Sequence, residues 1–189
     1  MWLRMFIVCL AAVIGSAADL QQYDYRVLAT TKTSTMEKEM NEAADAGYAF
    51  QAVMGGESAF GGKEVVLVMG KALGDRAGGN KRYKLLATKK TSTMEKELQQ
   101  MGEEGFAYRG QTVFESTFGG REVSVILERD AATGAKRIQY RLLATSKTST
   151  MQKELREAGE AGFNLLGMTV AKTSFGGSEL VCILSKELE

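Results

Sequence analysis

The feature that most constrains this chain is a segment that it carries three times. The copies begin at Tyr25, Tyr83 and Tyr140, and residues 25–71, 83–129 and 140–186 align without a gap. Self-similarity at a fixed period is typical of an array in which each unit is one small supersecondary element and neighbouring units bury a common core. The stretches between the segments are polar and rich in glycine and alanine, as linkers are. The sequence therefore predicts three tandem repeats joined by short linkers.

Within each repeat the hydrophobic period changes from that of a strand to that of a helix. In the first repeat Tyr25, Val27 and Ala29 stand at alternate positions, which is typical of a strand. A Lys-Thr-Ser-Thr-Met block follows, and its serine precedes a glutamate or glutamine by three residues in every repeat. This spacing predicts a capping box, in which the two side chains bond free backbone N–H groups at the start of a helix. The three pairs are Ser34 with Glu37, Ser92 with Glu95, and Ser149 with Gln152.

An apolar stripe and a glycine define the helix behind each predicted cap. Met36, Met40 and Ala43 of the first repeat fall at i, i+4 and i+7, which places them on one face of a helix. Gly47 and its counterparts are expected to end the helices in a left-handed conformation, after about eleven to thirteen residues. Two further strands follow, joined by a Phe-Gly-Gly turn whose paired glycines suit a tight hairpin. Each repeat is therefore predicted to be strand, helix, strand, strand.

The last strand of the third repeat is apolar on both faces. Leu180, Cys182 and Leu184 alternate with Val181 and Ile183, and a strand of this kind is buried on both sides. Helices can cover one face, so another element must cover the second. We expect an α+β fold in which the three repeats share one core. Its nine mainly antiparallel strands would form a curled or barrel-like sheet with pseudo-threefold symmetry and three helices outside. Two sheets packed together in a dimer are the alternative.

The first residues have the pattern of a secretory signal peptide. A start with one basic residue, Arg4, precedes an apolar run from Phe6 to Ile14 and the small residues Gly15-Ser16-Ala17-Ala18. We expect cleavage after residue 18 and a periplasmic or secreted mature protein with no membrane span. An uncleaved anchor is the alternative, although the run is shorter than the roughly 20 apolar residues that a spanning helix needs.

Composition narrows the classes of function. The formal net charge is +1, which argues against a nucleic-acid partner, because such binding depends on neutralising phosphates. The chain has no histidine, and cleavage would leave Cys182 as its only cysteine. Zinc, copper and haem sites rely on these two residue types, so we expect no metal and no cofactor. A single cysteine also excludes an intramolecular disulfide, and its place between leucines on a strand indicates a small buried hydrophobe.

The first repeat opens with Tyr23-Asp24-Tyr25-Arg26-Val27. This is similar to the opening Tyr-x-Tyr-Lys-Val of a family of small bacterial βαββ domains of unknown function, which each repeat resembles. Its helix exit, Gly-Trp-Glu-Leu-Val, is similar to Gly105-Phe106 and Gly162-Phe163-Asn164-Leu165-Leu166, with Phe or Tyr in place of Trp. Its closing strand is similar to Ile126-Leu127-Glu128-Arg129. The Lys-Thr-Ser-Thr-Met and Phe-Gly-Gly blocks are not part of the pattern. The resemblance implies the βαββ fold and no activity.

The block between the first strand and the helix is the best-retained part of the repeat and the first candidate site. A lysine, neighbouring hydroxyls and the unpaired N–H groups of a helix N-terminus together favour a small anion. The alternative is a strand-to-helix turn copied by duplication. The candidate residues are Lys32, Thr33, Ser34, Lys90, Thr91, Ser92, Lys147, Thr148 and Ser149.

The second candidate is a set of three aromatic rings at equivalent hairpin tips. Phe60, Phe118 and Phe175 each precede a glycine pair and would suit a partner surface. The alternative is that each ring folds back on its own sheet to shield the turn.

Catalytic patterns are weak, because a serine nucleophile needs a base and no histidine is present. We therefore expect an exported, non-enzymatic protein, a ligand- or partner-binding or structural module of the cell envelope. Its partner would be an unknown protein or a small anionic ligand, and it would be a monomer or homodimer. The alternative is a small hydrolase or lyase that uses carboxylates and lysines inside the sheet.

Overall fold

The computed structural model describes residues 21–57, 63–74, 79–88, 90–115, 121–132, 136–172 and 177–188. These residues form three units with the same order of elements: strand, helix, strand, strand. The first unit comprises β1 (Tyr23–Thr30), α1 (Thr33–Asp45), β2 (Ala49–Glu57) and β3 (Lys63–Ala72). The second comprises β4 (Lys81–Thr88), α2 (Thr91–Glu103), β5 (Ala107–Glu115) and β6 (Arg121–Asp130). The third comprises β7 (Ile138–Thr145), α3 (Thr148–Glu160), β8 (Asn164–Lys172) and β9 (Ser178–Glu187).

Every unit folds its three strands into a small antiparallel sheet of its own. The last strand lies in the middle, so the orders are β1-β3-β2, β4-β6-β5 and β7-β9-β8. The register is the same in all three, and a bulge interrupts β2, β5 and β8 near their starts. The predicted α+β class, the three helices and the nine antiparallel strands are therefore confirmed for the described residues.

The helices have the predicted length and the predicted end. Each spans 13 residues and buries the apolar stripe, with Met36 and Met40 of α1 almost fully covered. Gly47 follows α1 with a φ of 88°, and Gly105 and Gly162 have the same left-handed conformation after α2 and α3. Glycine adopts this conformation without the steric cost that a Cβ would bring.

The predicted capping boxes are wrong. Each helix begins one residue before the serine, with Lys32 as the N-cap of α1, and no N-cap side chain bonds the helix. The hydroxyl of Thr30 instead accepts a hydrogen bond from the Lys32 backbone N–H, at 3.2 Å, and closes the turn between β1 and α1. The same bond recurs at the start of the other two helices. Ser34 therefore lies in the first helical turn, where it is exposed.

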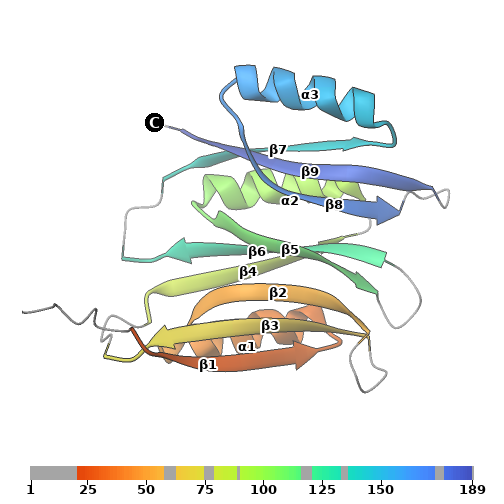
Figure 1. The fold of residues 1–189 in the computed structure, drawn as a ribbon. Coiled ribbons are helices and arrows are strands. Elements are labelled where there is room, and N and C mark those ends of the chain that lie inside the picture. The colour runs from red at the N-terminus through yellow and green to blue at the C-terminus, as the bar shows by residue number, and fades with distance from the viewer. Residues whose placement is uncertain are drawn as a thin grey trace, which may run out of the picture.

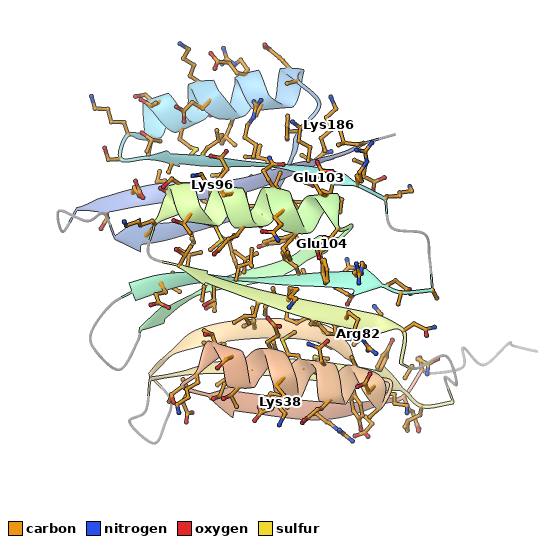
Figure 2. All side chains as sticks on the ribbon, turned by 180° about the vertical axis from the view of Figure 1, so that it is seen from behind. Lys38, Arg82, Lys96, Glu103, Glu104 and Lys186 are labelled. Atoms are coloured by element: carbon orange, nitrogen blue, oxygen red, sulfur yellow. The ribbon has the colours of Figure 1, made fainter. Side chains whose placement is uncertain are left out.

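The three sheets stack in a row with helices between them. Figure 1 shows the first unit at one end and the third at the other, with α1 and α2 on the far side of the sheets and α3 beyond β7 at the end of the stack. Figure 2 shows that side from the front, with Lys38 on α1 and Lys96 on α2. The expectation of one curled or barrel-like sheet with all helices outside is wrong, and the units form a linear array rather than a pseudo-threefold ring.

The second face of each later sheet is covered by the helix and the second strand of the preceding unit. Met36 and Met40 of α1 pack with Leu67 of their own sheet and also with Tyr83 and Ile126 of the next one. The α2 helix likewise packs with β6 and with β7 and β9 of the third unit. A later sheet therefore has its own helix on one face and the helix of the preceding unit on the other. Both faces of its strands are buried without any curling of the sheet.

The core of the third unit is smaller and contains the free cysteine. Met151 and Ala158 of α3 pack with Cys182 and Leu184 of β9. Cys182 is fully buried, and burial raises the pKa of its thiol. The interpretation of this cysteine as a small buried hydrophobe is confirmed.

Candidate functional site

The Lys-Thr-Ser blocks lie where the sequence predicts, at the N-termini of the three helices. Lys32, Lys90 and Lys147 are the N-cap residues and are exposed, as are Ser34, Ser92 and Ser149. Thr33 and Thr91 are half-buried, whereas Thr148 is exposed. All three helices begin on the same side of the stack (Figure 1), so the blocks lie in a row along it and do not converge on one ring.

The three phenylalanines of the hairpin turns are the second candidate site. Phe60, Phe118 and Phe175 lie outside the described residues, so their role in a partner surface stays a prediction.

A surface that the sequence analysis did not single out is formed by the outer face of the first sheet. Tyr23, Tyr25 and Val27 of β1 point to this face and are 47%, 58% and 67% exposed, and Met54 of β2 is 63% exposed. The register places Val27 beside Val68 of β3, so the patch continues across the sheet. We call these residues (Tyr23, Tyr25, Val27, Met54 and Val68) the terminal face.

The equivalent faces of the other two sheets are buried. Tyr83 and Tyr140, the counterparts of Tyr25, are each 1% exposed, and Ile126 and Ile183, the counterparts of Val68, are covered as well. The covering elements are α1 and β2 for the second sheet, and α2 and β5 for the third. Among the residues that the structure describes, no helix packs against the terminal face, so it stays exposed.

Polar side chains of the helix also bond the free backbone edge of the next sheet. The Asn41 amide of α1 accepts from the Tyr83 N–H at 3.0 Å and donates to the Tyr83 carbonyl at 3.1 Å. Glu37 accepts from the Leu85 N–H at 3.1 Å and pairs with Lys84 at 3.0 Å. An uncovered edge strand is a template for further pairing, and these side chains close the edge of β4.

The joint between the second and third units repeats this arrangement. Gln99 of α2 donates to the Tyr140 carbonyl, and Glu95 accepts from the Leu142 N–H at 3.5 Å. Gly102 lies so close to β7 that a Cβ there would stand 2.1 Å from the Ile138 carbonyl oxygen. The two internal joints are therefore the same interface built twice from equivalent positions.

The buried tyrosines lock these joints. The Tyr83 hydroxyl accepts from the Phe50 N–H at 2.9 Å and donates to Glu128 at 2.6 Å. The Tyr140 hydroxyl donates to the Phe106 carbonyl at 2.8 Å. Burial raises the pKa of both phenols above the ordinary tyrosine range, and for Tyr83 the bond to Glu128 adds to this effect. Burial also raises the pKa of Tyr108, to about 12.

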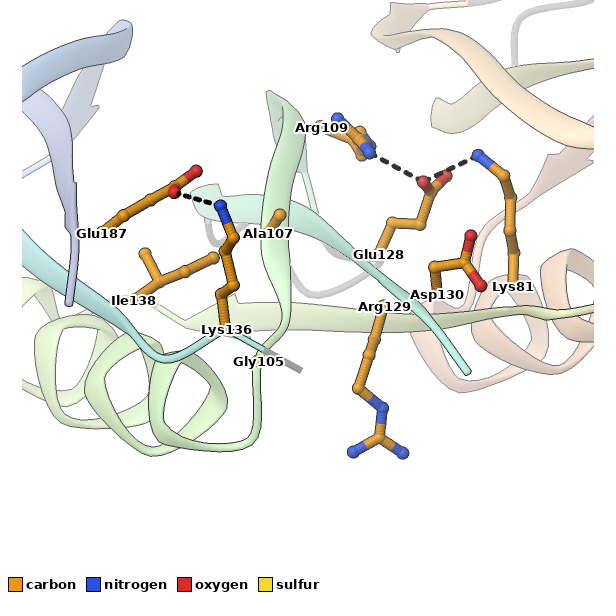
Figure 3. A pocket seen from close by; sticks show the side chains of 10 residues that line it. All are labelled: Lys81, Gly105, Ala107, Arg109, Glu128, Arg129, Asp130, Lys136, Ile138 and Glu187. Carbon is orange, nitrogen blue, oxygen red and sulfur yellow. Dashed lines mark hydrogen bonds and ion pairs between the residues drawn. The ribbon is translucent and has the colours of Figure 1, made fainter. Parts of the chain in front are cut away.

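A charged pocket lies beside the second joint. It has a volume of about 370 Å³ and is lined by ten residues, among them four cationic and three acidic side chains (Figure 3). Its centre is Glu128, which is 4% exposed and accepts from Lys81 and Arg109, each at 2.8 Å. Burial would raise the pKa of Glu128, but the bonds from Lys81, Tyr83 and Arg109 outweigh it and lower the pKa below its ordinary value.

The charges of the pocket hold its own units together and are poorly suited to chemistry. Its other charges are also engaged, since Lys136 pairs with Glu187 at 3.1 Å and Arg129 donates to the Glu104 carbonyl at 3.2 Å. A carboxylate that is ionised and bonded by three donors is a poor proton donor and a poor base. Glu128 occurs in one repeat alone, where the others have Gly70 and Ser185. A comparison of differences between the repeats would have found it.

No group of three or more His, Cys, Asp or Glu side chains among the described residues could hold a metal ion. Over the same residues, no helix combines the length and the apolar character needed to cross a bilayer.

Comparison with known proteins gives no relative, since no protein-family model, curated protein or solved structure matches the chain.

Proposed function

We infer that this protein is a non-enzymatic module that binds a protein partner through its terminal face. The observation that carries the inference is the contrast between Tyr25 and its counterparts: Tyr25 is 58% exposed, whereas Tyr83 and Tyr140 are buried by the preceding helix. Repeat arrays normally carry a polar outer face on their terminal units, because an apolar one promotes association. A contiguous exposed apolar patch on a folded domain marks an interaction surface.

The binding site would act outside the cytoplasm. The N-terminal pattern of one basic residue, an apolar run and small residues up to Ala18 supports export, so the partner would be met in the periplasm or outside the cell. Mass determination of the mature protein tests this part, since export with cleavage gives a chain that starts at Asp19.

Photo-crosslinking tests the binding face. A photoreactive amino acid at position 27, on the terminal face, is compared with one at Glu42, which is equally exposed but lies on α1. We expect a covalent protein adduct in the native cell from position 27 and none from position 42. Equal yields from the two positions, or no adduct from either, would contradict the proposed face.

A small anion at the helix N-termini is a second candidate. Lys32, Lys90 and Lys147 are exposed, and none of these N-cap side chains bonds its own helix, so the helix N-termini favour an anion. Replacing the three lysines by glutamine and titrating phosphate, sulfate and acidic glycans tests it. Binding that the triple variant retains in full would remove this candidate.

The remaining candidate, a hydrolase or lyase based on carboxylates and lysines, has less support. The described carboxylate best placed for it is Glu128. This group is held in its ionised form by three donors, so it has no proton to give and its oxygens are already bonded.

A further inference from the structure

We propose that the partner of the terminal face is a second copy of this chain, docked head to tail. The α3 helix and β8 of one molecule would cover the first sheet of the next, as α1 covers the second sheet and α2 the third. This inference rests on the proposed function, since it names the partner of that same face.

The terminal face has the side chains that the internal joints bury. Tyr25 stands at the position of Tyr83 and Tyr140, and Val27 at the position of Leu85 and Leu142. Valine in place of leucine keeps a branched apolar side chain at the contact. One half of the joint is therefore present, exposed and unoccupied at the start of the array.

The other half of the joint is exposed at the opposite end. Leu165, Met168 and Val170 of β8 are 53%, 62% and 50% exposed, whereas Phe50 and Val53, the counterparts of the first two in β2, pack against the core of the first joint. These three side chains lie on the face of the third sheet that carries α3, where a following unit would dock.

A glycine inside α3 marks the same surface. Gly102 in α2 permits the close approach of β7, because a Cβ there would meet the Ile138 backbone. Gly159 is its counterpart in α3, and nothing lies within 4 Å of the position that its Cβ would take. The first joint accommodates Ala44 at this position, whereas the second needs glycine. Glycine in a helix interior destabilises it, and the open space beside Gly159 suits the approach of a second backbone.

The polar groups predict a weaker contact than the internal joints. Gln152 replaces Glu37 and can still accept from the Val27 N–H of the next molecule, but Arg156 replaces Asn41 and cannot accept from the Tyr25 N–H. Both α3 side chains are exposed. Association would therefore be reversible and dependent on concentration.

The two ends differ, so the contact is heterologous and each added molecule leaves one end open. Such an interface gives a series of lengths rather than a closed dimer unless the rotation closes a ring. We expect sedimentation velocity of the full chain, purified as an exporting host delivers it, to show species larger than a monomer as the concentration rises from about 5 to about 500 μM.

Two end-blocking variants test the polarity of the contact. Val27→Glu places a charge on the terminal face, and Gly159→Gln fills the space beside α3; both positions are exposed, so each variant should fold. Each variant alone should be monomeric. An equimolar mixture should form a dimer and nothing larger, because one free α3 end meets one free terminal face.

A third variant tests the contact by strengthening it. Gln152→Glu with Arg156→Gln gives α3 the residues that α2 uses at Glu95 and Gln99. We expect self-association about tenfold tighter than that of the wild-type chain, as added charge-assisted hydrogen bonds allow. If this variant and the wild-type chain both stay monomeric throughout, or if either blocked variant alone still dimerises, the head-to-tail contact is overturned.

The two proposals fail differently. An adduct from position 27 to a different protein, with a monomeric purified chain, would leave the terminal face as a binding site and remove the second copy as its occupant. If the purified chain sediments as a monomer and position 27 gives no adduct, both the binding face and the second copy as its occupant are ruled out.

Discussion

The tyrosine that opens each repeat occupies two different environments. Tyr83 is buried, with its hydroxyl between the Phe50 N–H and the Glu128 carboxylate, whereas Tyr25 is largely exposed. The hydroxyl groups of these two equivalent tyrosines should therefore contribute differently to the free energy of unfolding. A buried donor or acceptor left without a partner is costly, and an exposed one is satisfied by water.

Removing the hydroxyl group should change stability by different amounts at Tyr83 and Tyr25. Tyr83→Phe leaves the Phe50 N–H and one Glu128 oxygen without a partner, and we expect a loss of about 2 kcal/mol in the free energy of unfolding. Tyr25→Phe is the matched control and should change it by less than about 0.5 kcal/mol. Chemical denaturation of both variants measures the difference. Equal effects would show that the Tyr83 hydroxyl does not hold the first joint.

Glu128 makes the stability of the second unit depend on pH. The pKa of its carboxyl is lowered in the folded state, so its contribution is present above the unfolded pKa and is lost as the pH falls through the lower folded value. Wild-type stability should therefore fall below about pH 4.5, which is the ordinary range of glutamate. Glu128→Gln should be less stable at neutral pH, and its difference from the wild type should shrink in acid. A difference that stays constant between pH 7 and pH 3 would contradict this role.

At the scale of elements, each internal helix has two packed sides. The α1 helix buries its apolar stripe on its own sheet and uses Glu37 and Asn41 to bond the edge of β4. The α3 helix has the first side alone, and Gln152 and Arg156 are exposed. One helix type therefore serves as an internal layer twice and as an outer layer once.

Two helical glycines at equivalent positions should respond in opposite ways to the same change. Gly102→Ala pushes a methyl group into the Ile138 backbone and should cost about 2 kcal/mol, as overpacking does. Gly159→Ala meets nothing within 4 Å and should stabilise the fold by about 0.5–1 kcal/mol through helix propensity. Thermal unfolding of dilute protein measures both changes. The same sign for the two would show that the α2 contact with β7 is not as close as described.

The local features of the elements could be predicted from the sequence, and the contacts between units could not. Met36, Met40 and Gly47 define a helix and its end through short-range periodicity. The apolar faces of β9 predict burial on both sides, but a curled sheet and a preceding helix satisfy that pattern equally well. The spacing of Glu37 from Ser34 predicts a capping box, and nothing in the spacing of Glu37 or Asn41 indicates the strand edge that they bond.

The candidate sites divide in the same way. The position of Lys32 at a helix N-terminus follows from the sequence alone, apart from the identity of the cap. The terminal face does not, because the opening tyrosine is the same in all three repeats and its exposure depends on whether a unit precedes it. The pocket at Glu128 arises from one substitution whose partners, Lys81 and Arg109, are distant in the chain.

At the scale of the whole molecule, stability should be highest in the middle of the array. The residues of β6 from Val123 to Glu128 are all buried, whereas β1 is mostly exposed and α3 buries only Met151 and Ala158. In a repeat array the terminal units lack one of their two neighbours, so they open more readily than the central one.

Hydrogen exchange of dilute protein should reveal this gradient. We expect the slowest amide exchange in α2 and β6, and faster exchange by about an order of magnitude or more in β1 and α3. Mass spectrometry of peptides from the three units measures it. Equal rates throughout the array would indicate a single cooperative unit instead.

The one-way contact between units also gives the chain an order of assembly in time. A polypeptide that leaves a ribosome or a translocation channel presents its first unit before the others. The side chains of α1 that bond the β4 edge come before β4 in the chain, and those of α2 come before β7. The surface on which each later unit docks is therefore synthesised first, so no docking strand has to wait for a partner that is still to be made.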